Sequence, residues 1–364
     1  MNSLTEILAL SLVPGLGPVT YKNLMKKFGS AFEVLRAKPS ELHLVRGVSE
    51  LMIQALLDPS LLKKAKEEID LAREERVRIL MREDFPDDLK QIYAPPIVLY
   101  VKENVSALRG VKIAVVGARD ASIYGRQTAS LVAKELTEAG VTVVSGMAMG
   151  IDCAAHEGAL AAGGPTIAVL ACGLSRISSG PPQDMANRIV DAGGTVISEY
   201  PMRMNAEPGF FPVRNRIISG LASGVLVVEA KAKSGALITA DAALEEGREV
   251  YAIPGNVDSI RSQGTLKLLK QGAKLVTSAA DILQDLELLC GKPRIARSLE
   301  EKSRAALSEE ENSVLSLLGS EPRHVDELID HAAIPAKNAI SALSFLEIKG
   351  YVKQLPGKNY VVVK

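Results

Sequence analysis

From residue 111 onward, short apolar runs alternate with amphipathic segments. The pattern predicts strands at residues 111–117, 141–146, 166–173, 195–200, 224–230, 249–255 and 274–276. It predicts helices between them, at residues 124–139, 152–162, 183–192, 214–222 and 236–246. Strands that are apolar throughout, each followed by a helix, are typical of a parallel sheet covered on both faces. The sequence therefore predicts an α/β fold with a Rossmann-like, doubly wound sheet.

The two ends of the chain follow other patterns. Residues 1–80 show helical spacing, with breaks at the run VPGLGP and at Gly29, so we expect a small helical domain of SAM-like or helix-hairpin-helix type. Residues 81–290, with a further strand at 97–101, form the predicted extended Rossmann-like domain. Residues 291–307 are charged and weakly periodic, as in a linker. Helices near 309–318, 324–331 and 336–349, then strands at 351–355 and 359–363, predict a winged helix over 308–364.

Composition limits where an anion can bind. The chain has 43 basic and 43 acidic residues, so any anion site is a local cluster rather than a charged surface. There is no Trp, and aromatic residues make up 4% of the chain, which argues against stacking many bases on aromatic side chains. No apolar run approaches the ~18 residues of a membrane span. Three scattered cysteines and the absence of a secretory signal lead us to expect a cytoplasmic protein.

Glycines and polar residues follow the predicted strands at the edge where doubly wound sheets bind ligands. After the first strand come Gly117, which lets backbone N–H groups approach a phosphate, and Arg119, which can hold one bidentately. After the second come Ser145, Gly146 and Gly150, which predict a backbone nest for an anion. The two segments together predict part of a phosphate-binding rim.

Two further segments extend this rim. One contains Phe211, Arg214, Asn215 and Arg216 at the predicted start of a helix. Cations there oppose the helix macrodipole, which indicates an anion nearby, and Phe211 offers a ring on which a base can stack. The other contains Ser234 and Gly235, which supply a hydroxyl and bare backbone for a phosphate. We therefore expect a rim that suits a polymer of phosphates.

The sequence carries no catalytic or cofactor signature. The first strand lacks the Gly-x-Gly-x-x-Gly fingerprint, so no dinucleotide cofactor is expected, and no metal site is predicted. Asp152 suits a helix N-cap, and His156 suits a packed helix residue. We expect a binding protein rather than an enzyme. The alternative is a nucleotide-processing enzyme related to nucleoside-monophosphate phosphoribohydrolases, but their glycine-rich, glutamate-bearing loop is replaced here by KSGALIT at 233–239.

The four segments resemble the DNA-processing protein A family, DprA or Smf. The resemblance is carried by GARDASIYG (117–125), SGMAMGIDCAAH (145–156), SEYP (198–201), FPVRNRIISGL (211–221), VEAKAKSGALITA (228–240) and EGREVYAIPG (246–255). It implies single-stranded DNA binding, loading of RecA in natural transformation and recombination, a homodimer formed through the Rossmann-like domain, and no established enzymatic activity.

The resemblance also implies roles for particular residues. Arg119 would grip a phosphate, and Phe211, Arg214 and Arg216 would line one basic pocket in which Asn215 orients them. Ser234 and Gly235 would contact backbone phosphate. The chain departs from the family at 176–182, which lacks the usual Tyr-Pro pair, and at Leu266, where the family has Asn. Both departures bear on the shape of the pocket rather than on the fold.

Overall fold

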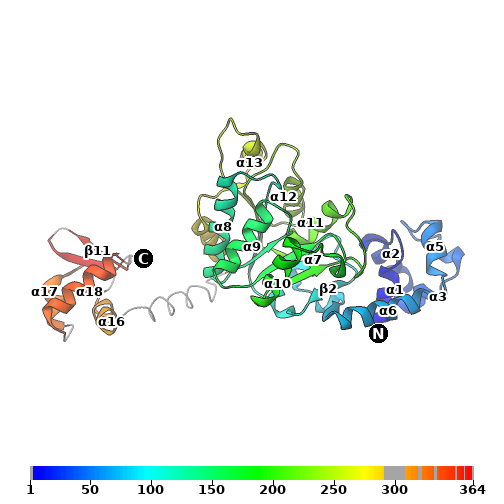
Figure 1. The fold of residues 1–364 in the computed structure, drawn as a ribbon, viewed down its shortest axis with the longest axis horizontal. Coiled ribbons are helices and arrows are strands. Elements are labelled where there is room, and N and C mark those ends of the chain that lie inside the picture. The colour runs from blue at the N-terminus through cyan, green and yellow to red at the C-terminus, as the bar shows by residue number, and fades with distance from the viewer. Residues whose placement is uncertain are drawn as a thin grey trace. The chain divides into compact units, whose positions relative to one another are not determined.

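The computed structural model describes residues 3–290, 308–318, 322–331, 334–348, 351–355 and 357–362. The chain divides into two compact units, residues 1–291 and 292–364, and both can be followed in Figure 1. The predicted linker at 291–307 lies outside the described residues. A further division of the first unit at residue 80 stays a prediction.

The first unit is built on a nine-stranded sheet with the order β1-β2-β6-β5-β4-β3-β7-β8-β9. The parallel strands are β3 (Lys112–Val116), β4 (Thr142–Ser145), β5 (Thr166–Leu170), β6 (Thr195–Ser198), β7 (Gly224–Val227), β8 (Glu249–Ala252) and β9 (Lys274–Leu275). Strand order reverses between β3 and β7, because β4 pairs with one side of β3 and β7 with the other. The doubly wound prediction is confirmed, and the reversal defines the switch point where such sheets bind ligands.

Two antiparallel strands extend the sheet beyond β6. They are β1 (Val77–Leu80) and β2 (Leu99–Lys102). The sequence pattern predicted a strand near β2 but none at β1. β1 has only four residues and a mixed burial pattern, so its strand character depends on pairing with β2. The short helix α7 (Asp87–Gln91) and the single turns η1 (Arg82–Asp84) and η2 (Val105–Leu108) complete this region.

Helices cover both faces of the sheet. On one face lie α8 (Ile123–Glu138), α9 (Ile151–Ala161) and α10 (Pro181–Asp191), and on the other α11 (Phe210–Leu221) and α12 (Gly235–Glu245). The turns η3 (Leu174–Arg176) and η4 (Ile260–Ser262) and the helices α13 (Gln263–Lys270) and α14 (Ala279–Cys290) follow β5, β8 and β9. Both faces carry a buried and largely aliphatic core, in keeping with the 4% of aromatic residues in the chain.

Helix α11 begins at Phe210 rather than at the predicted residue 214. Pro212 lies in its first turn, where a proline is tolerated because those N–H groups have no partner within the helix. Arg214 and Arg216 therefore lie in the second turn. The argument from the macrodipole was wrong, because neither cation stands at the helix N-terminus.

The N-terminal segment is helical, as predicted. It contains α1 (Leu4–Ser11), α2 (Pro18–Phe28), α3 (Ala31–Arg36), α4 (Pro39–Leu42), α5 (Glu50–Leu56) and α6 (Leu61–Glu74). The predicted breaks occur where expected: Gly15 has φ 78° between α1 and α2, and Gly29 ends α2 at φ 80°. Leu8 and Leu24 belong to the same buried cluster as Tyr100 and Leu174 of the sheet region. These helices therefore share a core with one face of the sheet.

The second unit has the predicted winged-helix order. Its helices are α16 (Glu309–Ser316), α17 (Val325–His331) and α18 (Ala336–Ile348), followed by β11 (Val352–Leu355) and β12 (Asn359–Val362). A two-residue strand that was not predicted, β10 (Arg323–His324), pairs with β12 and makes the sheet three-stranded. Val314, Leu328 and Leu343 lie in its own apolar core.

Candidate functional site

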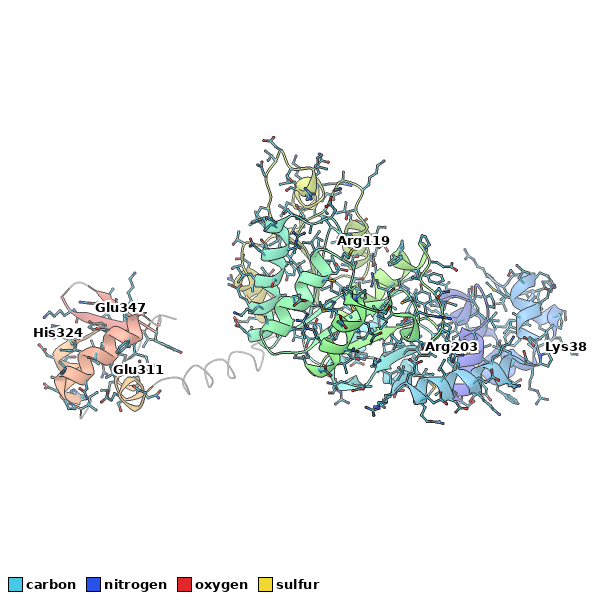
Figure 2. All side chains as sticks on the ribbon, in the orientation of Figure 1. Lys38, Arg119, Arg203, Glu311, His324 and Glu347 are labelled. Carbon is cyan, nitrogen blue, oxygen red and sulfur yellow. The ribbon has the colours of Figure 1, made fainter. Side chains whose placement is uncertain are left out.

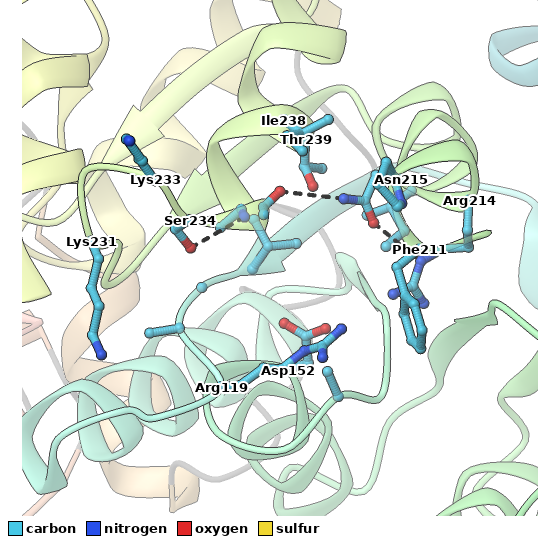
Figure 3. A pocket seen from close by; sticks show the side chains of 18 of the residues that line it. Arg119, Asp152, Phe211, Arg214, Asn215, Lys231, Lys233, Ser234, Ile238 and Thr239 are labelled. Carbon is cyan, nitrogen blue, oxygen red and sulfur yellow. Dashed lines mark hydrogen bonds between the residues drawn. The ribbon is translucent and has the colours of Figure 1, made fainter. Parts of the chain in front are cut away.

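A cleft of about 560 Å³ opens at the carboxyl ends of β3 and β7, where the strand order reverses. Figure 3 shows it from close by, with Lys231 and Lys233 on one side and Phe211 and Arg214 on the other. The predicted site residues that line it are Gly117, Arg119, Phe211, Arg214, Asn215, Ser234 and Gly235. Predicted residues from three separate segments therefore meet at the predicted edge of the sheet, and the fourth segment contributes Ala148 and Asp152 instead of its predicted residues.

The loop after β3 is fastened to the end of β7. The N–H of Ala118 donates to the carbonyl of Glu229 at 2.8 Å, and the Glu229 carboxylate accepts from the backbone N–H and the hydroxyl of Ser122 at 2.9 and 2.5 Å. A Cβ on Gly117 would lie 2.6 Å from Ile151, so only glycine allows this close packing. These contacts fix the loop that carries Arg119.

Arg119 is exposed at the mouth of the cleft, and Figure 2 locates its side chain in the first unit. Its guanidinium lies over the Phe211 ring, 4.7 Å from the ring centroid. A stacked guanidinium keeps its N–H donors directed outward in its own plane, where they can form a bidentate contact with a phosphate. The pair thus offers an oriented cation beside an aromatic ring.

Two lysines that were not among the predicted site residues add positive charge. Lys231 and Lys233 are exposed on the loop between β7 and α12, and both line the cleft. Lys231 pairs with Asp120 at 3.3 Å, whereas Lys233 forms no ion pair within the described residues. The signal was present in the sequence, because both lysines stand in the KAKSG run directly after a predicted strand.

Ser234 and Gly235 shape the wall beside these lysines. The Ser234 hydroxyl caps α12 by accepting from the N–H of Ala236 at 3.3 Å. The carbonyl of Gly235 accepts from Asn215 Nδ2 at 3.3 Å, a bond drawn as a dashed line in Figure 3. The start of α12 is thereby tied to α11 across the cleft.

Arg214 forms the floor of the cleft rather than an arm reaching out of it. Its side chain is buried, with 4% of the residue exposed. Its guanidinium donates to the carbonyls of Gly146, at 2.9 Å, and Val169, and to Asn215 Oδ1 at 3.2 Å. Burial lowers the pKa of Arg214, and the nearby Asp152 opposes that shift. Arg214 thus joins the loop after β4 and the end of strand β5 to α11.

Asp152 lies close to this network. It stands in the first turn of α9, whose N-cap is Gly150, so its expected capping role was wrong. The carboxylate accepts instead from the N–H of Gly146 at 3.2 Å. Burial raises the pKa of Asp152, while Arg214 and backbone N–H groups oppose the shift. Its charge is directed inward, toward the floor of the cleft.

The remaining predicted residues lie behind or outside the cleft. The Ser145 hydroxyl is buried and donates to the carbonyl of Val115 at 2.6 Å. Gly150 has φ 90°, and a Cβ there would lie 2.3 Å from the Ala118 carbonyl, so it supports the Arg119 loop from behind. Arg216 forms a buried ion pair with Glu199. Burial raises the pKa of Glu199, and Arg216 opposes that shift.

A smaller hollow of about 280 Å³ adjoins the cleft on the other side of Arg119 and Phe211. Its lining includes Gly146, Met147, Met149, Leu170 and Ile177 and is largely apolar. The segment at 176–182, which departs from the family pattern, contributes to its wall, whereas Leu266 lines neither cavity. The first departure therefore affects the hollow and leaves the cationic cleft unchanged.

The nucleophiles and bases near the cleft are poorly placed for chemistry. Burial raises the pKa of Cys153 to about 11 and also raises that of Cys172. His156 is fully buried, its Nδ1 lies 2.8 Å from Thr166 Oγ1, and burial lowers its pKa to about 3. Within the described residues, no three His, Cys, Asp or Glu side chains are grouped to hold a metal ion. In the same part of the chain, no helix combines the length and apolarity required of a membrane span.

Glu245 and Glu246, which follow the KSGALIT segment, lie far from the cleft and do not replace the glutamate of the hydrolase loop. Gly235 begins α12 at the cleft, and Glu245 ends it, which separates them by about 15 Å of helix. Both carboxylate oxygens of Glu246 lie 3.0 Å from the backbone nitrogen of Tyr93 and accept its N–H. Neither glutamate can reach a ligand bound beside Arg119.

The fold and this cleft define a class: a Rossmann-like protein with a cation-lined cleft at its switch point, followed in the sequence by a winged helix. The model of the family DNA recombination-mediator protein A matches residues 76–287, and that of the DprA winged helix domain matches residues 299–358. The chain belongs to this family, and the resemblance read from its motifs is confirmed.

Relatives agree with this assignment. Protein Smf of Escherichia coli is 39% identical over 279 residues, which cover 76% of this chain and 74% of that protein. The crystal structure of DNA processing protein A from Streptococcus pneumoniae matches with a TM-score of 0.59 at 33% identity, covering 78% of this chain and 98% of that one. A structure of DNA processing protein A from Helicobacter pylori, whose subject is its single-stranded DNA binding mode, matches with a TM-score of 0.53 at 28% identity. It covers 58% of this chain and 95% of that one.

Proposed function

We propose that the cleft binds the phosphodiester backbone of single-stranded DNA. The observation that carries this proposal is the Arg119 guanidinium, stacked 4.7 Å over Phe211 at the mouth of a cleft that Lys231 and Lys233 also line. Cations supply phosphate contacts, and the half-buried Phe211 ring beside them supplies apolar surface that can pack against any base. The Helicobacter pylori relative, which binds single-stranded DNA, supports the same reading.

The cleft suits binding better than catalysis. Its buried carboxylate, Asp152, is engaged by backbone N–H groups, and the nearby thiols have raised pKa values. The exposed groups at its mouth are chiefly cationic side chains, a hydroxyl and bare backbone, and the exposed carboxylate there, Asp120, is paired with Lys231 and Arg261. Such groups hold an anion in place but offer no activated nucleophile or general base. We therefore assign the cleft a DNA-binding role and no enzymatic one.

Family membership extends the proposal beyond the cleft. We infer that the chain loads RecA onto the bound strand in natural transformation and recombination, acts in the cytoplasm, and dimerises through its Rossmann-like unit. The measurement for RecA loading is the rate of RecA filament formation on strands coated with single-strand-binding protein. We expect this rate to rise with added protein; an unchanged rate would limit the function to DNA binding.

The cleft itself is tested by Arg119→Ala. We expect about a tenfold loss of affinity for labelled oligothymidylate at low salt, since a charge-assisted contact is lost. The slope of log affinity against log salt should fall by about 0.7. Arg109→Ala is the matched control, because Arg109 is also exposed but precedes β3, at the opposite end of the strand that Arg119 follows. Equal affinity and slope in the two variants would overturn the proposal.

A further inference from the structure

The carboxylate of Asp120 stands among the cations of the cleft mouth. It accepts from Lys231 Nζ at 3.3 Å and from Arg261 Nη2 at 3.0 Å. The backbone carbonyl of Asp120 also accepts from Arg261 Nε at 2.8 Å. Three segments meet here: the loops after β3 and β7, and the turn η4. Asp120 thus pairs with two cations. One of them, Arg261, lies in a segment that was not predicted to belong to the site.

This arrangement is solvent-facing and fully charged. Asp120 is exposed, and Lys231 and Arg261 are each partly exposed. Hydrogen bonds from Arg261 first, and then from Lys231, hold the pKa of Asp120 below its usual value. The carboxylate is therefore ionised throughout the neutral range. A carboxylate and a phosphate present similar oxygen acceptors to such cations, so the two compete for the same donors.

We propose that Asp120 is an internal competitor that occupies an outer phosphate position of the cleft, and that a DNA phosphate displaces it to reach Lys231 and Arg261. Arg261 is then a DNA-binding residue. The inference rests on the proposed function and names the groups that set its affinity. Arg261 keeps its Nε bond to the Asp120 carbonyl when the carboxylate moves away, so its remaining N–H groups stay directed at the vacated position.

The competitor favours a polymer over a single nucleotide. An isolated phosphate must displace Asp120 with only its own contacts. A strand already held at Arg119 and Lys233 presents its next phosphate at high effective concentration, so displacement is easier. Asp120 thus lowers the affinity for every anion but lowers it least for a chain of phosphates. It is a specificity-determining residue at the edge of the cleft.

The test is Asp120→Asn, which keeps the side-chain shape and removes the charge. We expect oligothymidylate to bind about two- to fivefold more tightly at low salt, the range typical of one exposed charge interaction. The salt slope should change little, because Lys231 and Arg261 contact phosphate in the bound complex whether or not a carboxylate competes for them in the free protein. Asp258→Asn is the matched control: Asp258 is exposed near η4 and forms no ion pair within the described residues. It should leave affinity and slope unchanged.

A double-mutant cycle with Arg261→Gln distinguishes two roles for Asp120: competing with DNA for Arg261, or positioning Arg261 to bind DNA. Arg261→Gln alone should weaken the binding of oligothymidylate. The gain in affinity that Asp120→Asn produces should be smaller in the Arg261→Gln protein than in the native protein. Weaker binding by Asp120→Asn alone would overturn the inference, because Asp120 would then only position the cations. Equal binding by Asp120→Asn and Asp258→Asn would overturn it as well. If the unchanged protein failed to bind oligothymidylate, the proposed function itself would fall instead.

Discussion

Two sets of cations surround the cleft, and they differ in what their donors already bind. Arg119 and Lys233 are exposed, and neither forms an ion pair within the described residues. Arg214 and Arg216 are largely buried. Arg214 donates to two backbone carbonyls, and Arg216 is paired with Glu199. A cation binds an incoming phosphate most readily with donors that the fold has left free or that an exposed carboxylate can release, as proposed for Lys231 and Arg261. The comparison therefore predicts which cations bind DNA and which ones hold the site together.

This difference also explains why the motif FPVRNR is a poor guide to DNA contacts. Phe211 and Arg214 are three residues apart on α11 and both line the cleft, but Arg214 is turned down into its floor. Arg216 is two residues further on and points to Glu199, away from the cleft. Residues two apart on a helix do not share a face. The three side chains of this short motif therefore have different positions. Phe211 lines the cleft, Arg214 lies in its floor, and Arg216 forms an ion pair away from it.

The largest expected effect comes from Arg214→Ala. The change leaves Asp152 buried without its countercharge and removes the partner of two carbonyls, so we expect a loss of about 3–5 kcal/mol in the free energy of unfolding. Urea unfolding measures this loss. Arg119→Ala is the exposed counterpart and should stay within about 0.5 kcal/mol of the native protein. Similar losses in both variants would erase the distinction between the two sets.

Arg216→Met should be nearly as damaging, by about 3 kcal/mol, because Glu199 would stay buried without its partner. The double variant Glu199→Met with Arg216→Met should recover much of that loss, since a buried apolar pair replaces a buried ion pair. Oligothymidylate affinity of the folded double variant should equal that of the native protein. A clear loss of affinity together with a lower salt slope would instead indicate that Arg216 contacts DNA.

Lys233→Ala should act in the opposite way, on binding alone. We expect the affinity for oligothymidylate at low salt to fall about threefold and the salt slope to fall by about 0.7. The free energy of unfolding should not change. The matched control is Lys134→Ala on α8, an exposed lysine outside the cleft. Fluorescence anisotropy at several salt concentrations makes the measurement. The assignment of Lys233 to the cleft fails if both lysine variants bind alike.

The smallest effect concerns an exposed ion pair, which sharpens the contrast with Glu199 and Arg216. Arg188 donates to both carboxylate oxygens of Glu157 at 2.7 and 2.8 Å, and this contact lowers the pKa of Glu157. A lowered pKa in the folded state adds stability above the unfolded value of about 4.3, and that stability is lost as pH falls through the folded value. Glu157→Gln should therefore cost about 0.5 kcal/mol at neutral pH. Unfolding curves of the two proteins should converge in acid; a pH-independent difference would contradict this.

The doubly wound sheet, the winged helix and the edge of the sheet at which the cleft opens could all be predicted from the sequence. Periodicity suffices for these, because strand burial and helix spacing are local consequences of which positions are apolar. The same holds for Gly117 and Arg119, since a glycine and an arginine directly after a buried strand have one edge of the sheet on which to lie. The start of α11 at Phe210, ahead of Pro212, shows how even a local boundary can be misplaced.

Which polar side chains face the cleft depends on contacts between distant parts of the chain. Ser145 and Gly146 are neighbours in the sequence, but the first bonds inward to β3 and the second lies beneath the Arg214 guanidinium. The grouping of Asp120, Lys231 and Arg261 joins residues up to 141 positions apart, and no sequence spacing encodes it. Phosphate binding by this rim stays a prediction; the cleft lies at the expected edge of the sheet, but Ser145, Gly150 and Arg216 do not line it. Which donors are free depends on their partners, and most of those partners come from distant strands.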